Sequence, residues 1–353
     1  MAYTAIDKST DHFETILYSG NNTTNTAITG LDFEPDWVWI KSRSAAASSA
    51  LFNSVIGVTY HQVTNANSTQ AGDGSYFKSF NSNGFTIGTG GQVNDSGVTY
   101  ISWNWKAGTS FSNDASSTGV GTIDSSGSVN DTAGISICKW VGTGSNGTVK
   151  HGLTTKPQVI LQKNTGYAYD WYTWHDGIPI NQYLKLNTQG SATSSDSGGV
   201  TFGNTDPTTS VFSLGNDGGS NRSGDTHLAY IFSERKGFSK FGSYTGNGNA
   251  DGTYVDLGFR PAWVMTKRSN NSENWYIIDN KRSPFNPPLN ASYANLNYAE
   301  DTNATGRIQD FLSNGFKLRT SDTAVNGNGD TYVYYAFAEN PFVTSTGIPV
   351  TAR

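Results

Sequence analysis

The chain has 353 residues, of which 14% are charged and 13% are aromatic. Charged residues make up about 25% of an average globular protein, so this chain is poor in charge. Its formal net charge of −5 is spread thinly and includes no clustered basic patch, which argues against nucleic acid as a partner. No apolar run is long enough to cross a bilayer, and we expect no membrane insertion.

The residue types favour strands over helices. Aromatic and β-branched residues prefer strands, and the 40 glycines, together with many Ser, Thr and Asn residues, favour the turns between strands. No segment keeps a 3.6-residue apolar period. The composition therefore predicts an all-β fold.

Four sequence markers recur in the same order three times along the chain. They are an aromatic residue two positions before a glycine, a proline that opens a strand ending in lysine, a Phe-x-(Ile/Leu) motif, and an Asn-x-x-Gly-x-Thr motif. The marker aromatics at 18, 140 and 244 are separated by the same two intervals as the marker prolines at 35, 157 and 261. Matching intervals predict three tandem copies of one unit.

Each copy has the length of one β-sandwich, with room for about seven strands. We expect sandwich repeats at 1–110, 132–240 and 241–342, and a C-terminal tail at 343–353. The Ser/Gly-rich segment 111–131 between copies one and two is interpreted as a linker, or as a loop with one edge strand.

The first proline-led strand shows how each copy should pack. Trp37 and Trp39 face one way, and Val38 and Ile40 face the other. Apolar side chains on both faces are typical of a central sandwich strand. The fourth marker should form a turn with its glycine at positive φ, which applies to Gly97, Gly224 and Gly329.

Three segments resemble a known family of repeats. The segment 142–153 with the strand 157–163 resembles a repeat common in phage tail-fibre-like and other virion-associated proteins. The segments 257–264 and 1–7 resemble marine phage relatives of that repeat. The resemblance implies jelly-roll or concanavalin-A-like sandwiches in a particle component, and it carries no catalytic residues. Copy two departs from it, because Val159 and Ile160 stand where the other copies have Trp-Val.

No catalytic residues are expected. Glycosidases need two carboxylates flanking the scissile bond, and the six glutamates fall in separate segments. Asp176 and Asp279 are placed in corresponding positions of copies two and three, but Asn53 takes that place in copy one, which favours a structural hydrogen bond. The lone Cys138 should be buried and inert. The five histidines lack metal-ligand spacing: His12, His61, His151, His175 and His227.

Calcium is the one cofactor that the sequence suggests. Asp217 and Asp225 lie in a Gly-rich loop of copy two, and Asp330 lies in a similar loop of copy three. Oxygen ligands on flexible loops suit a hard cation. Asn, Asp and Gly are also ordinary residues of strand connections, and this second interpretation is favoured.

The segment 167–176 holds the densest aromatic cluster and is the candidate contact site. In an extended chain, Tyr167, Tyr169 and Trp171 share one face, and Tyr172 and Trp174 share the other. One face could be core and the other an exposed platform for a sugar ring or a partner loop. The alternative is burial of both faces, one of them beneath the neighbouring copy.

These features predict a non-enzymatic structural protein on the surface of a bacteriophage particle, made in the host cytoplasm and bound to other virion proteins. A tail-fibre-like or tail-associated component that recognises host glycan is the first interpretation. A head decoration protein bound to the major capsid protein is the alternative, and a polysaccharide-degrading enzyme is a distant third. We also expect a homo-oligomer.

Overall fold

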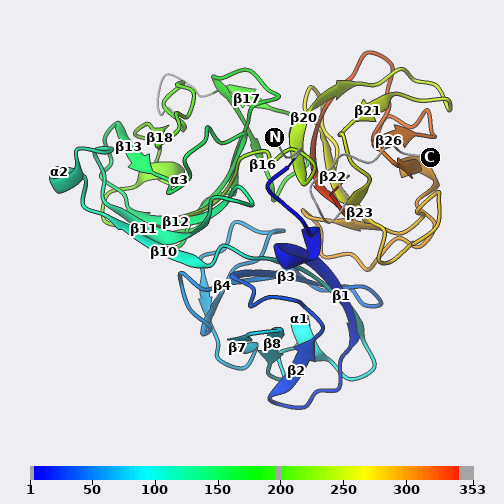
Figure 1. Ribbon diagram of the computed structural model, residues 1–353, viewed down its shortest axis with the longest axis horizontal. Helices are drawn as coiled ribbons and strands as arrows, with labels where there is room; N and C mark the ends of the chain where they lie inside the picture. The colour runs from blue at the N-terminus through cyan, green and yellow to red at the C-terminus, as the bar shows by residue number, and fades with distance from the viewer. Residues whose placement is uncertain (1–3, 195–200, 342–353) are drawn as a thin grey trace.

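A computed structural model describes residues 4–194 and 201–341, and the predicted tail at 343–353 lies outside this range. Strands make up nearly all of the regular structure, and they form antiparallel sheets packed face to face. The predicted all-β sandwich class is therefore confirmed. Figure 1 shows three lobes, one for each third of the chain, arranged around a common centre.

Lobe 1 packs a sheet of order β1-β9-β3-β4 against a sheet of order β2-β8-β7. Its strands are β1 (Phe13–Ser19), β2 (Thr26–Thr29), β3 (Trp37–Ser42), β4 (Ala50–Asn53), β5 (Tyr60–His61), β6 (Ala71–Gly72), β7 (Phe77–Asn81), β8 (Gly84–Ile87) and β9 (Thr99–Trp105). Its short helices are η1 (Ser9–Asp11) and α1 (Gly91–Asn94).

Lobe 2 packs a sheet of order β10-β11-β12-β19-β14-β15-β16-β17 against the pair β13-β18. Its strands are β10 (Thr109–Asn113), β11 (Ser125–Asn130), β12 (Ile135–Val141), β13 (Gly147–Lys150), β14 (Val159–Asn164), β15 (Tyr172–His175), β16 (Gln182–Lys185), β17 (Thr193–Ser194), β18 (Val211–Leu214) and β19 (Thr226–Phe232). Its helices are α2 (Ala115–Thr118) and α3 (Gly218–Asn221).

Lobe 3 packs a sheet of order β20-β27-β22-β23-β24 against a sheet of order β21-β26-β25. Its strands are β20 (Ser239–Thr245), β21 (Tyr254–Asp256), β22 (Pro261–Arg268), β23 (Trp275–Asp279), β24 (Ala291–Tyr293), β25 (Gln309–Leu312), β26 (Gly315–Leu318) and β27 (Thr331–Ala338), with the 3-10 helix η2 (Thr305–Arg307).

One strand order recurs in the large sheet of every lobe. The first strand pairs with the last, the last with the proline-led strand, and that strand with the next, as in β1-β9-β3-β4, β12-β19-β14-β15 and β20-β27-β22-β23. We interpret this recurrence as three copies of one sandwich, as the sequence markers predict.

The segment between copies one and two is not a linker. Residues 109–130 form β10, α2 and β11, and both strands extend the large sheet of lobe 2 beyond β12. The pairing is continuous, because β11 registers with β12 from Ser125 opposite Trp140 to Asn130 opposite Ile135. The Ser/Gly-rich composition concealed these strands, since few of their side chains are apolar.

The large sheets are buried on both faces, as β3 illustrates. All six of its residues are buried. Val38 and Ile40 belong to the sandwich core of lobe 1, whereas Trp37 and Trp39 belong to a second core shared by all three lobes. The predicted burial of both faces is thus confirmed, and the outer face is covered by the other lobes.

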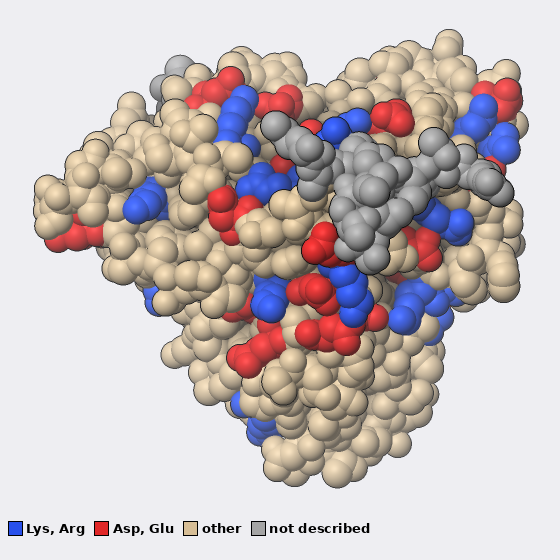
Figure 2. Space-filling view, in the orientation of Figure 1, with Lys and Arg blue, Asp and Glu red and all other residues tan. Residues whose placement is uncertain are grey.

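The shared core is an aromatic cluster at the centre of the molecule. The Trp37 ring stacks on Trp105 of its own sheet and on Tyr230 of lobe 2, with centroids 4.2 Å apart in both cases. Phe13 of lobe 1 stacks on Phe337 of lobe 3 at 5.0 Å. Figure 2 shows charged side chains gathered around the centre of one face, whereas the outer parts of the lobes carry few charges on that face.

A buried asparagine fixes the turn before the last strand of each lobe. In lobe 2, Asn221 Oδ1 accepts a hydrogen bond from Thr143 N (2.9 Å), and its Nδ2 donates to the Ser145 and Gly215 carbonyls (2.6 and 3.0 Å). Asn94 and Asn326 make the equivalent three contacts in lobes 1 and 3. The fourth marker therefore ties the ends of three strands together.

The glycine of the same turn adopts positive φ in every lobe, as predicted. The φ values are 77° at Gly97, 80° at Gly224 and 74° at Gly329. The glycine of the first marker has a different role, because a Cβ on Gly142 would lie 2.2 Å from the Arg222 carbonyl oxygen. One glycine thus supplies a turn and the other a close backbone approach.

We predict that Gly224→Val lowers the free energy of unfolding by about 1–2 kcal/mol, because valine in the left-handed region is strained. No atom lies within 4 Å of the position of the added Cβ, so bulk contributes little. Gly224→Asn should cost clearly less, since asparagine tolerates this conformation. Urea unfolding measures both, and equal losses in the two variants would contradict the assignment.

Candidate functional site

The structure separates the five aromatic residues predicted as a contact site. Trp171 is fully buried in the shared core and donates from Nε1 to the Val63 carbonyl of lobe 1 (2.8 Å). Tyr172 and Trp174 point into the sandwich core of lobe 2. These three rings therefore cannot form an exposed platform; the alternative interpretation, burial of both faces with one beneath the neighbouring copy, holds for them.

The other two predicted residues remain at the surface. Tyr167 is 50% exposed, and its ring centroid lies 5.5 Å from that of Tyr169. The Arg222 guanidinium sits 4.3 Å from the Tyr167 centroid and forms an ion pair with Asp225 (3.1 Å). Sequence reasoning missed Arg222, because it comes from a distant turn that only the fold brings to the aromatic pair.

The calcium candidates have protein partners of their own. Asp217 caps α3 by accepting from Gly219 N (2.7 Å), and Asp225 accepts from the Asn164 amide (2.9 Å). Asp330 forms an ion pair with Arg268 (2.6 Å). Across residues 4–194 and 201–341, no group of three or more His, Cys, Asp or Glu residues could hold a metal ion.

Cys138 and four of the five histidines are buried. Burial lowers the pKa of His151, His175 and His227 to about 4 each, so all three are neutral near pH 7. Burial also lowers the pKa of His12 and His61. Cys138 is fully buried, and burial raises the pKa of its thiol.

The predicted correspondence of Asp176 with Asp279 is wrong by one residue. Strand pairing places Asn53, His175 and Asp279 opposite equivalent positions of the proline-led strands. Asp176 lies just beyond its strand, is exposed and pairs with Lys156 (3.0 Å). The aspartates therefore share neither a position nor a site.

The three equivalent residues instead bridge the lobes in a cycle. Each one contacts the last strand of the next lobe: Asn53 Nδ2 donates to Tyr230 OH (2.8 Å), His175 Nε2 lies 3.2 Å from the Tyr334 carbonyl oxygen, and Asp279 accepts from Trp103 Nε1 (3.3 Å). Lobe 1 thus binds lobe 2, lobe 2 binds lobe 3, and lobe 3 binds lobe 1.

The marker lysines form a second cycle in the opposite direction. Each is buried and donates from Nζ to a backbone carbonyl of a neighbouring lobe: Lys41 to Leu296 (2.7 Å), Lys163 to Asn67 (3.4 Å) and Lys267 to Gln189 (3.2 Å). Burial lowers their pKa to about 8 for Lys41, about 8 for Lys163 and about 7 for Lys267. The buried marker lysine of each copy therefore forms a hydrogen bond across an interface between lobes.

A buried ionic network is added where lobe 3 meets lobe 1. The side chains of Arg282 and Asp279 are fully buried and pair at 2.7 Å. Arg282 also contacts Glu300 (3.3 Å), which pairs with Arg43 of lobe 1 (2.8 Å). Burial alone would raise the pKa of Glu300, but the hydrogen bond from Arg43 and the two arginine charges lower it. This interface joins segments that the chain does not connect directly.

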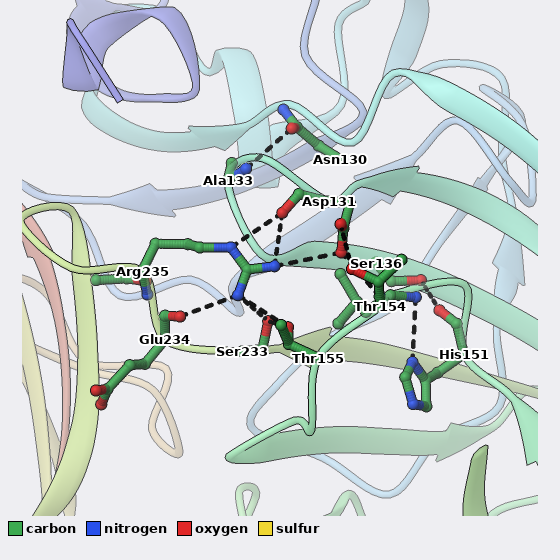
Figure 3. Close-up of polar contacts among 12 residues, drawn as sticks. Asn130, Asp131, Ala133, Ser136, His151, Thr154, Thr155, Ser233, Glu234 and Arg235 are labelled. Carbon is green, nitrogen blue, oxygen red and sulfur yellow. Dashed lines mark hydrogen bonds and ion pairs between the residues drawn. The ribbon is translucent and has the colours of Figure 1, made fainter. Parts of the chain in front are cut away.

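An arginine cluster holds the connection between lobes 2 and 3 (Figure 3). Arg235 donates from Nε to the Asp131 carbonyl (2.9 Å) and from Nη1 to the hydroxyls of Thr155 (2.9 Å) and Ser233 (2.8 Å). Burial opposes ionisation of Asp131, but hydrogen bonds from Thr154 and the charge of Arg235 lower its pKa. Because the donors of Arg235 are used in these hydrogen bonds, we assign the cluster a structural role in holding the connection between lobes 2 and 3.

Fold and site together define an all-β protein of three sandwiches locked around one aromatic core. The family described as Domain of unknown function (DUF7483) matches residues 8–341, and the chain belongs to this family. The matched region spans all three lobes as one unit. Comparison with curated proteins and with solved structures gives no match. None of the helices in the described part of the chain could span a membrane.

We predict that the buried lysines make the protein more stable as the pH rises from 7 to 9.5. Their folded pKa lies below the unfolded value of about 10.4, so the unfolded chain binds more protons in this window and stability increases with pH. In urea unfolding, the free energy of unfolding of Lys163→Met should rise between pH 7 and 9.5 by about 2 kcal/mol less than that of the unchanged protein. Parallel pH profiles would contradict the prediction.

We predict that Arg282→Met lowers the free energy of unfolding by about 3–5 kcal/mol, because it leaves Asp279 buried without its ionic partner and removes one of the two arginines that pair with Glu300. Lys156→Met provides the matched control. It removes the exposed pair with Asp176 and should cost less than about 1 kcal/mol. Denaturant unfolding measures both, and a similar small loss for the two variants would show that the buried network does not hold the interface.

Proposed function

We propose that this chain is a non-enzymatic structural component of a bacteriophage particle, exposed on its surface and associated with the tail. The resemblance of 142–163 to virion-associated repeats supports the particle assignment. The observation that carries the proposal is the locking of three sandwiches by two cycles of inter-lobe contacts. Such a block resists deformation, which suits a load-bearing part.

The chemistry of the described residues supports the non-enzymatic part of the proposal. Burial keeps His151, His175, His227 and Cys138 neutral near pH 7, and the fully buried carboxylate of Asp279 is paired with Arg282. A catalytic acid or base needs access to substrate and a pKa near the working pH. The exposed Tyr167 and Arg222 provide a surface for contact instead.

Gold-tagged antibody fragments against this protein, imaged on purified particles by electron microscopy, test the proposal. We expect gold on the tail or its fibres, and an unrelated tagged fragment serves as the control. Gold spread over the head would overturn the tail assignment and favour the alternative, a decoration protein bound to the capsid. Absence of gold from every particle would overturn the virion assignment.

A further inference from the structure

A groove of about 630 Å³ lies on lobe 2 beside the segment that was expected to be a linker. Ligand sites in proteins have volumes of about 300–1,000 Å³, so the groove is large enough for a small molecule or part of a chain. It is lined mainly by β10, β11, the loop before β11 and the end of β12, and Figure 1 places α2, which follows the lining residue Asp114, at the outer tip of lobe 2. One lining residue, Lys139, also donates to the Val55 carbonyl of lobe 1, so the groove extends from the outer part of lobe 2 to a contact with lobe 1.

The wall of this groove is an addition to the common framework. In lobes 1 and 3 the equivalent edge strands, β1 and β20, have no further partner strand within the described ranges. Only lobe 2 extends its sheet with β11 and β10. Two lobes form the sandwich without this extension, so the framework does not require it.

Hydrogen bonds hold the added wall in one conformation. Asp114 caps α2 by accepting from Ser117 N (3.0 Å), and Asp124 accepts from Ala115 N (2.8 Å). The Asn113 amide donates to the Val120 carbonyl (2.9 Å). A wall fixed in this way would lose little conformational entropy on binding a ligand.

The lining defines the chemistry of the ligand. Hydroxyls are the commonest polar group and come from Ser112, Ser125, Ser126, Thr122, Thr143 and Thr226. Two carboxylates, Asp114 and Asp124, and a single lysine, Lys139, line the groove, and the Lys139 ammonium already donates to the Val55 carbonyl (3.2 Å). This balance disfavours anions. Apolar surface is present at Val141, which is 55% exposed, whereas Ile123 is only 5% exposed and belongs to the sandwich core.

We propose that the groove binds a neutral saccharide, with ring hydroxyls bonded to the serine, threonine and carboxylate oxygens and a ring face against Val141. Sugars combine many hydroxyls with apolar C–H faces, which matches a lining that mixes hydroxyls with aliphatic groups. This inference rests on the proposed function, since it locates glycan recognition on a particle component. The groove, and not the buried part of the predicted aromatic cluster, is its site.

An array of neutral and anionic oligosaccharides, followed by titration calorimetry with the best neutral ligand, tests the inference on the full chain. Ser112→Trp should fill the groove and weaken binding at least tenfold. Ser110→Trp is the matched control: it lies on the same face of the same exposed strand, outside the groove, and should bind as the unchanged protein does. Both variants should keep the original melting temperature.

Two results would overturn the inference: no neutral oligosaccharide bound by the unchanged protein, or equal binding by both tryptophan variants. Preference for anionic sugars would also contradict the assigned ligand class. Asp124→Asn gives a second test if Ser112→Trp fails to fold, because it removes a carboxylate acceptor and should weaken binding several-fold. Failure here would leave the gold-labelling result intact, so it would reject the groove without rejecting the particle assignment.

Discussion

The stacking of Trp37 between Trp105 and Tyr230 is the contact on which the molecule depends, because it joins two lobes at the centre. Each aromatic side chain buries about 150–250 Å², which corresponds to a hydrophobic stabilisation of roughly 4–6 kcal/mol. A sandwich alone would leave one face of its large sheet, lined with tryptophan, in water. Packing three such faces together removes that surface from all of them.

Polar contacts then decide how the lobes are oriented. Hydrophobic burial is non-directional, whereas the hydrogen bonds of Asn53, His175 and Asp279 fix which strand faces which. The three lysines add a cost, since each unit of lowered pKa corresponds to about 1.4 kcal/mol spent on removing the charge from water. That cost is offset by burial of aromatic surface in the shared core. An arrangement of the lobes in which the lysines lacked their carbonyl partners would be still less stable.

The sequence predicts much of this fold and little of its assembly. The alternation of Trp37 and Trp39 with Val38 and Ile40 indicates a strand apolar on both faces, and the motif glycines indicate left-handed turns. Burial of the tryptophan face by the other lobes could not be predicted, because the residues that cover it are far away in the chain. Lysine is almost always exposed, so Lys41 gave no sign of burial.

The same limit applies to the candidate sites. Trp171 belongs to a cluster that looks like a binding platform, and only the neighbouring lobe shows that the ring is core. The groove was hidden for the opposite reason, since a Ser/Gly-rich stretch predicts a linker unless its pairing with β12 is known. Arg222 reaches Tyr167 through a turn that local sequence does not connect to it.

The contact between Trp103 and Asp279 has a consequence for biosynthesis. The two residues are 176 positions apart, and Asp279 belongs to the last lobe to be made. At roughly 5–20 residues per second, lobe 1 leaves the ribosome about ten to thirty-five seconds before its partner exists. During that interval the part of its tryptophan face that lobe 3 covers, around Trp103 and Trp105, remains uncovered. Translation speed, rather than strand pairing, therefore sets how long the nascent chain must be shielded from aggregation.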